Sequence, residues 1–289
     1  ALGCMRMSGL DSGSAARLIS AACESGINYF DHADIYGGGK SESVFRDALK
    51  QAKIPRGDVF IQTKCGIKKG CFDYSKEHII SSAEQSLARL GTDYADALLL
   101  HRPDTLMEPE EVAEAFDRLH SSGKVRYFGV SNHNSGQIKL LGKYVRQPLI
   151  INQLQFSITN TGMIDSGLNV NMKNPPSVDH DGGLLEFCRI EGITIQPWSP
   201  FQHGFFEGTY IGNAKYKELN EELAKTAAEH GISVEAASIA WILRHPAKMQ
   251  PIIGTTKPER VAEISKASEI SLTREKWYSL YLSAGNTLP

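Results

Sequence analysis

The chain has 289 residues, of which 41% are hydrophobic, and its 31 Lys and Arg nearly balance 33 Asp and Glu, for a formal net charge of −2. Such a balance creates no general attraction to nucleic acid or to an anionic membrane surface, so we expect neither as a partner. No apolar run reaches the roughly 18 residues that a membrane-spanning helix needs. The length fits one or two ordinary domains, or one α/β barrel with insertions.

Five cysteines stand at scattered positions, an odd number with no Cys-x-x-Cys spacing. They predict neither a disulfide framework nor a zinc site, and we expect reduced thiols in a cytoplasmic protein. The first residues are too few for a signal peptide. The abrupt start at Ala1 leads us to expect a short preceding segment in the natural chain.

One pattern recurs four times: an amphipathic helix, a glycine, and a short β-rich run. Apolar spacing gives the period of each element, and a glycine after a helix takes the left-handed conformation that ends it. The helices are expected at residues 15–25, 76–90, 110–122 and 184–191, the glycines are Gly26, Gly91, Gly123 and Gly192, and the strands are expected at 27–31, 95–101, 125–130 and 193–198.

Four further apolar runs complete a set of eight expected strands, at residues 2–5, 59–64, 149–154 and 251–253. Parallel strands need helical crossovers, so we predict an α/β fold, a (β/α)8 TIM barrel forming one domain over residues 1–289. A doubly wound sheet is the rival, which the missing glycine-rich dinucleotide turn disfavours. The excess length falls at residues 156–182, 202–218 and 273–289.

The run Gly37-Gly38-Gly39-Lys40-Ser41 invites comparison with a phosphate-binding P-loop. The first glycine of that motif would fall on Asp34, and the last glycine of a dinucleotide fingerprint would fall on Glu42. Both motifs therefore fail, and the segment is expected to be a plain loop before a helix.

Ionisable side chains stand at or just beyond the ends of three neighbouring expected strands. Asp31 ends one strand, with Tyr36 five residues later, Lys64 ends the next, and His101 ends the third. The C-terminal ends of barrel strands carry active sites, so we expect these four side chains to form one site.

The chain resembles the aldo-keto reductase superfamily over nearly its whole length. The resemblance rests on Phe-Asp-His-Ala-Asp-Ile-Tyr-Gly at 30–37, Lys64, His-Arg-Pro-Asp at 101–104, Gly-Val-Ser-Asn at 129–132, and Gly-Thr-Thr-Lys-Pro-Glu-Arg-Val at 254–261. His32 and Arg102 are similar to a bacterial oxidoreductase subgroup, the YdhF-like group. The resemblance implies a (β/α)8 barrel that binds NADPH without a Rossmann motif and reduces an aldehyde or ketone to the alcohol.

By this resemblance, Tyr36 is the general acid, Lys64 lowers its pKa, Asp31 pairs with Lys64, and His101 orients the carbonyl. An ammonium favours the phenolate of a nearby tyrosine, and a carboxylate keeps that ammonium charged. The implied NADP(H)-binding residues are Ser131, Asn132, Gln153, Trp198, Ser199, Pro200, Phe201, Gly204, Gly254, Thr255, Thr256, Lys257, Arg260 and Glu263. Lys257 and Arg260 would supply positive charge for a 2′-phosphate.

Two other functions compete with this prediction. A regulatory subunit of the same fold, similar to the β-subunits of potassium channels, would keep the four residues but turn over slowly. A metal-dependent barrel hydrolase could use Asp31 and His101, but Lys64 would then lie as an unbalanced charge beside the metal. We therefore expect a monomeric enzyme with a small carbonyl substrate and no metal.

Overall fold

The computed structural model describes residues 1–289, which divide into two compact units. The first unit comprises Ala1–Gln153 and Gly254–Val261, and the second comprises Leu154–Ile253 and Ala262–Pro289. The expected single domain over the whole chain stays a prediction. No helix combines the length and the apolar character that a membrane crossing requires.

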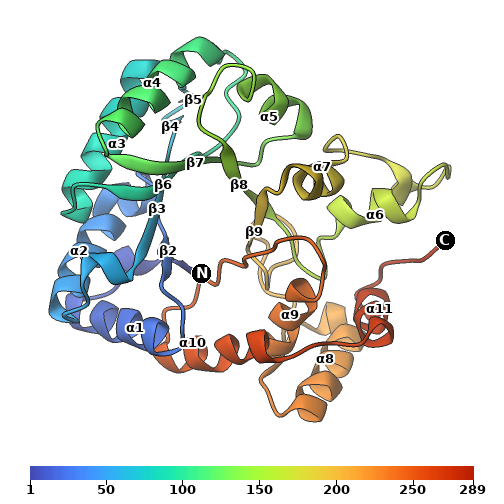
Figure 1. Cartoon of the computed structure of the whole chain (residues 1–289). Helices are drawn as coiled ribbons and strands as arrows, with labels where there is room; N and C mark the ends of the chain where they lie inside the picture. Colours follow the sequence, from blue (N-terminus) through green and yellow to red (C-terminus); the bar gives the residue numbers. More distant parts are fainter. The chain divides into compact units, whose positions relative to one another are not determined.

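The first unit alternates strands and helices (Figure 1). Its elements are β1 (Leu2–Gly3), α1 (Ser12–Glu24), β2 (Tyr29–Asp31), α2 (Lys40–Gln51), β3 (Phe60–Cys65), β4 (Ile67–Lys68), β5 (Cys71–Phe72), α3 (Lys76–Leu90), β6 (Ala95–Leu100), α4 (Pro109–Ser121), β7 (Val125–Ser131), α5 (Ser135–Leu141) and most of β8 (Leu149–Gln155). The start of α10 (Pro258–Ser265) also belongs to it.

The second unit holds the remaining elements. They are α6 (Gly162–Leu168), α7 (Leu184–Glu191), β9 (Thr194–Trp198), α8 (Lys217–His230), α9 (Val234–Leu243) and α11 (Arg274–Ser283). Trp241 on α9 and Trp277 on α11 join two of these helices. Their rings stack with centroids 4.8 Å apart, and each indole N–H donates to the other residue's carbonyl across 3.0 Å.

The main sheet has the strand order β1-β2-β3-β6-β7-β8-β9, and the pairs through β8 are parallel. The order follows the sequence without reversal. A doubly wound sheet reverses its strand order at a switch point, so this order supports the barrel prediction and not its rival. The four glycines predicted to end helices all have positive φ, between 63° and 76°.

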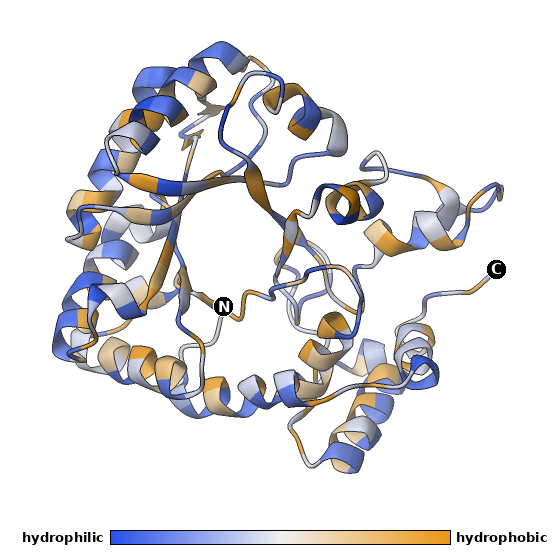
Figure 2. Ribbon diagram, in the orientation of Figure 1, coloured by the Kyte–Doolittle hydropathy of each residue, from blue (hydrophilic) through white to orange (hydrophobic).

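Helices α1 to α4 pack against one another in sequence on one side of the strands (Figure 1). Each of these helices has an apolar and a polar side, and Figure 2 shows hydrophobic (orange) and hydrophilic (blue) residues on each of them. In α4, Val112, Phe116 and Leu119 are buried, and Pro109 occupies its first turn, where a missing amide hydrogen costs nothing. All six residues of β6 are buried, as expected of a strand covered on both faces.

The structure corrects the prediction at two places. Residues 251–253 do not form a strand, although Gln250 N and Ile252 N donate to the carbonyls of Ile195 and Pro197 in β9. Pro197 has no amide hydrogen to return, so the ladder is incomplete. The hairpin of β4 and β5 was not predicted, because two-residue strands leave no periodic pattern.

Residues 156–182 and the C-terminal tail are joined by side chains within the second unit. Tyr281 on α11 donates to Asp165 of α6 across 2.6 Å, and Thr161 donates to the same carboxylate across 3.0 Å. The Asn286 amide donates to the Ile158 carbonyl across 3.1 Å. These two excess segments therefore form one packed arrangement.

Candidate active site

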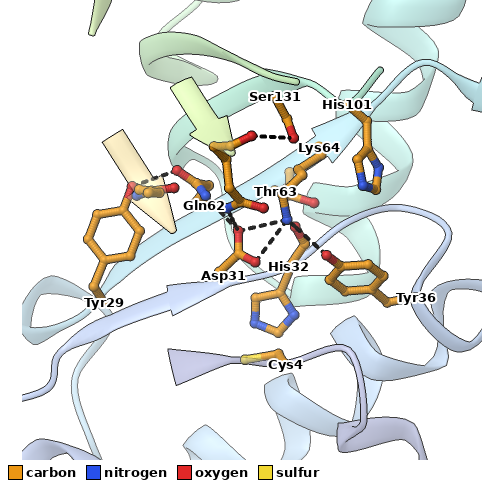
Figure 3. A network of polar contacts seen from close by, with 12 residues as sticks. Cys4, Tyr29, Asp31, His32, Tyr36, Gln62, Thr63, Lys64, His101 and Ser131 are labelled. Atoms are coloured by element: carbon orange, nitrogen blue, oxygen red, sulfur yellow. Dashed lines mark hydrogen bonds and ion pairs between the residues drawn. The ribbon is translucent and has the colours of Figure 1, made fainter. Parts of the chain in front are cut away.

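Three adjacent parallel strands bring the predicted catalytic residues to one edge of the sheet. Asp31 is the last residue of β2, Lys64 is next to last in β3, and His101 directly follows β6. Tyr36 begins a short 3-10 turn after β2. All four lie in the first unit, and Figure 3 shows their side chains converging.

The turn that presents Tyr36 depends on glycine. Gly37 and Gly38 have φ of 58° and 64°, a region that other residues rarely adopt. A Cβ atom on Gly37 would lie 2.5 Å from Ser8 Cβ. The glycine run that looked like a phosphate loop is therefore needed to hold the tyrosine close to the strands.

The Lys64 ammonium is the centre of the site (Figure 3). Its Nζ lies 2.7 Å and 2.9 Å from the two Asp31 carboxylate oxygens, 2.8 Å from the His32 carbonyl and 3.1 Å from Tyr36 Oη. Its side chain is 0% exposed and that of Asp31 is 3% exposed. A buried ion pair is tolerated when further hydrogen bonds satisfy both ions, as they do here.

Burial and charge act in opposite directions on these groups. Burial lowers the pKa of Lys64, but the Asp31 carboxylate and Tyr36 together outweigh it, and the net pKa is raised. Burial raises the pKa of Tyr36, and the Lys64 ammonium lowers it only in part. Lys64 lowers the pKa of Tyr36, as expected, but the net effect of burial and charge is to raise that pKa. The phenol of Tyr36 therefore stays protonated at neutral pH.

His101 is neutral in this site. Its ring is edge-on to that of Tyr36, with centroids 6.0 Å apart and planes at 81°. Burial lowers its pKa to about 2, with smaller contributions from the positive charges of Lys64 and Arg102. Its Nδ1 is buried without a hydrogen-bond partner. A neutral imidazole can still donate or accept a hydrogen bond at a carbonyl oxygen.

Two glutamines contact Asp31, one from the adjacent strand β3 and one from the more distant strand β8. Gln62 Nε2 donates to Asp31 Oδ1 across 2.6 Å, and Gln153 Nε2 donates to the same oxygen across 3.0 Å. Gln62 was absent from the sequence prediction. The available signal was its position two residues before Lys64, because alternate residues of a strand share a face.

Two of the predicted nicotinamide residues of the first unit, Ser131 and Asn132, lie at the end of β7 and directly after it. Ser131 Oγ donates to the Gln153 carbonyl across 3.0 Å, and Asn132 Nδ2 donates to Ser131 Oγ across 2.7 Å. Asn132 has a φ of 60°, one of five non-glycine residues with positive φ. Such strained backbone is often found at ligand sites.

The predicted adenosine segment lies at the start of α10, also in the first unit. Thr255 is buried, and its hydroxyl accepts from the Lys257 amide across 3.2 Å. Gly254 and Thr256 are half-buried, and the Gly254 carbonyl accepts a hydrogen bond from Arg6. Lys257 and Arg260 are exposed, so their charges are accessible to an anion.

The other predicted cofactor residues belong to the second unit. Trp198 ends β9, and Ser199 follows it with a φ of 53°. Trp198 contacts the rings of Phe205 and Phe206 at centroid distances of 6.0 Å and 6.3 Å.

Carbonyl groups of the loop after Ser199 accept hydrogen bonds that hold the loop in place. The Pro200 carbonyl accepts from Tyr210 Oη across 2.9 Å, the Phe201 carbonyl accepts from Tyr210 N across 3.1 Å, and the Gly204 carbonyl accepts from Gln155. Glu263 forms an ion pair with Lys266 at 2.9 Å.

Comparison with known proteins identifies the family of the chain. The model of the aldo/keto reductase family matches residues 1–281. The chain is 37% identical to the uncharacterized oxidoreductase YcsN of Bacillus subtilis (91% of this chain, 86% of the relative) and 38% identical to the oxidoreductase YdhF of Escherichia coli (90% and 83%). The chain therefore belongs to the aldo/keto reductase family.

The fold is the (β/α)8 barrel of that family, as predicted. A crystal structure of the thermostable aldo-keto reductase Tm1743 with the inhibitor epalrestat superposes with a TM-score of 0.77 at 26% identity, covering 98% of this chain and 94% of the other. A 6-dehydroglucose reductase of Agrobacterium fabrum is 34% identical (92% and 86%). A putative voltage-gated potassium channel subunit beta of Schizosaccharomyces pombe is 29% identical (87% and 78%).

Proposed function

We propose that this chain is an NADPH-dependent reductase that converts an aldehyde or ketone to the alcohol, with Tyr36 as the proton donor. The observation that carries the proposal is Lys64 Nζ lying between Asp31 and Tyr36 Oη, at 2.7 Å and 3.1 Å. Reduction of a carbonyl needs a proton at oxygen as the hydride arrives at carbon. A protonated phenol beside a fixed ammonium meets that need, because the ammonium stabilises the phenolate that forms.

The other two members of the proposed catalytic tetrad (Asp31, Tyr36, Lys64 and His101) have distinct roles in this proposal. Asp31 keeps Lys64 charged and in place. His101, neutral and edge-on to Tyr36, orients the carbonyl oxygen by a hydrogen bond. A metal is not part of the scheme, because both Asp31 oxygens already contact the ammonium.

The residues present fit a nicotinamide cofactor. Asn132 directly follows β7 and Ser199 directly follows β9, and the backbone of both has a positive φ. Ser131, Asn132 and Gln153 would hold the carboxamide, and Trp198 would offer a ring face to the nicotinamide. When bound, the reduced cofactor supplies the hydride. Ser199, Pro200, Phe201 and Gly204 would cover the pyrophosphate, and the adenosine end would meet Gly254, Thr255, Thr256, Lys257, Arg260 and Glu263.

Tyr36→Phe tests the chemistry. We expect carbonyl-dependent NADPH oxidation to be abolished while NADPH still binds, measured by fluorescence titration. Tyr144→Phe is the matched control, because Tyr144 is exposed and remote from β2 in the sequence. Turnover at the wild-type rate in Tyr36→Phe would contradict the proposed mechanism.

The preference for NADPH is tested separately. Lys257→Ala and Arg260→Ala should each weaken NADPH binding and leave NADH binding nearly unchanged, because only NADPH carries the 2′-phosphate. An equal loss for both nucleotides would reject this assignment.

The substrate panel should span sugar aldehydes and simple aldehydes and ketones, since one relative is named for a dehydroglucose. The second candidate, a regulatory subunit, has support only from the potassium channel relative. It predicts NADPH binding without turnover on any carbonyl, and a membrane partner recovered in stoichiometric amount.

A further inference from the structure

A chain of buried polar groups approaches Asp31 on the side away from Tyr36. Gln62 on β3 is fully buried, and its Nε2 lies 2.6 Å from Asp31 Oδ1. Its Oε1 lies 2.6 Å from Tyr29 Oη, at the start of β2. Figure 3 shows Tyr29, Gln62, Asp31 and Lys64 in one continuous row.

The direction of these hydrogen bonds follows from chemistry. An ionised carboxylate only accepts, so the amide nitrogen of Gln62 must face Asp31. The amide oxygen then faces Tyr29, whose hydroxyl must donate. The Tyr29 ring is itself fixed, because it stacks on Phe60 with centroids 4.4 Å apart and planes at 17°. Gln62 is therefore held in one orientation from both sides.

We propose that Gln62 is a positioning residue which, by restraining the Asp31 carboxylate, keeps Lys64 charged and aligned with Tyr36. This role rests on the proposed function, because it matters only if Tyr36 donates the proton. Asp31 Oδ1, the oxygen that Gln62 holds, is also the one 2.7 Å from Lys64 Nζ. Tyr29 does not contact Asp31 in this network but orients the Gln62 amide by donating to its oxygen.

The consequence is a specific pH effect. Without the Gln62 amide, Asp31 keeps only Gln153 as an amide donor and is restrained less, so Lys64 loses part of its counter-charge. Burial favours a neutral lysine, so the ammonium is lost at lower pH once Asp31 no longer opposes burial. The phenolate of Tyr36 then loses its stabilising charge, so the alkaline limb of the kcat profile, which reports loss of the Lys64 ammonium, moves to lower pH.

Gln62→Met tests the proposal, since methionine has a similar size but neither donates nor accepts as an amide does. A hydrogen bond to a charged group accounts for about a tenfold change or more, so we expect kcat to fall by about 10-fold or more. The alkaline limb should move to lower pH, and the dissociation constant for NADPH should not change. Tyr29→Phe should shift the same limb less, and should add little in the Gln62→Met background.

Thr63→Val is the matched control. Thr63 is on the same strand and nearly fully buried, but its hydroxyl donates to Glu42 across 2.7 Å. We expect the alkaline limb of the kcat profile of Thr63→Val to stay at the wild-type pH. An equal shift in Thr63→Val would assign the effect to the stability of β3 and overturn the proposal.

The outcomes separate this inference from the proposed function. Turnover in Tyr36→Phe means that the proposed function has failed. An unmoved alkaline limb and wild-type kcat in folded Gln62→Met, with Tyr36→Phe inactive, overturn the role of Gln62 alone. If Gln62→Met does not fold, Tyr29→Phe decides, and an unmoved limb there overturns the role equally.

Discussion

Gln153 donates a hydrogen bond to Asp31 across 3.0 Å, which links the end of β8 to the carboxylate at the end of β2. Sequence resemblance assigned Gln153 to the cofactor carboxamide. The structure adds a second contact, on the same oxygen that Gln62 and Lys64 approach. A residue between the proposed nicotinamide site and the ion pair can serve both.

Gln153→Met should therefore differ from Gln62→Met. We expect weaker NADPH binding together with a lower kcat, because one amide contacts Asp31 and would also contact the cofactor. Fluorescence titration and steady-state kinetics measure the two effects separately. If Gln153→Met binds NADPH as the wild type does, Gln153 is not a cofactor contact.

Much of the fold follows from the sequence, for physical reasons. Apolar spacing located strands such as Ala95–Leu100 within one residue, because a strand covered on both faces is rich in apolar residues. Gly91 marked a helix end because its φ of 63° suits glycine. The predicted tetrad comes together because parallel strands place their C-terminal ends at one edge.

Other features could not be predicted from the sequence. One buried polar residue in a strand, such as Gln62, looks the same whether it bonds Asp31 or a backbone carbonyl. The sequence analysis uses His32 only for its resemblance to a subgroup and predicts no contact for it, yet its carbonyl accepts from Lys64 while its ring packs against Phe45. The pairing of Asp165 with Tyr281 joins residues 116 positions apart, which local patterns do not encode.

The ion pair of Lys64 and Asp31 allows stability to be separated from catalysis. Lys64→Met leaves a buried carboxylate without its counter-charge, so we expect a loss of about 3–5 kcal/mol in the free energy of unfolding. Adding Asp31→Asn removes the orphaned charge and should restore much of that loss. Urea denaturation measures the stability of both variants.

Catalysis should not recover in the double variant, because the ammonium beside Tyr36 is still absent. Activity assays on the same preparations check this. Stability that stayed low in the double variant would show that packing around the lysine chain, and not the unpaired charge, caused the loss.

His101 should show no titration near neutral pH. Burial, Lys64 and Arg102 lower its pKa to about 2, so the ring stays neutral through the working range. We expect no step in activity between about pH 5 and 8 from this residue, whereas an unperturbed histidine titrates near 6.5. NMR titration of the imidazole signals measures this directly.

Substitution of His101 gives a second measure. His101→Gln keeps a hydrogen-bonding group near the ring position and should retain more activity than His101→Ala. Equal losses would mean that the imidazole does not act by a hydrogen bond to the carbonyl. A His101 signal titrating near pH 6.5 would contradict the neutral ring.

Asp34 gives the chain a pH-dependent stability. Burial, and then repulsion from Glu42, raise its pKa from 3.8 to about 6. A carboxyl with a raised pKa favours folding while it is protonated, so its contribution is complete below about pH 3.8 and is lost as the pH rises through 6. About two pKa units correspond to a loss of up to about 3 kcal/mol between those limits.

Asp34→Asn removes this titration. We expect the variant to gain stability relative to the wild type as the pH rises from 4 to 8, measured by urea unfolding at each pH. Asp47→Asn is the control, because Asp47 is exposed and its pKa is lowered by Arg46, so its effect has the opposite sign. A stability difference between Asp34→Asn and the wild type that did not change with pH would mean that Asp34 is ionised throughout, with a nearby positive charge such as Arg89 compensating its burial.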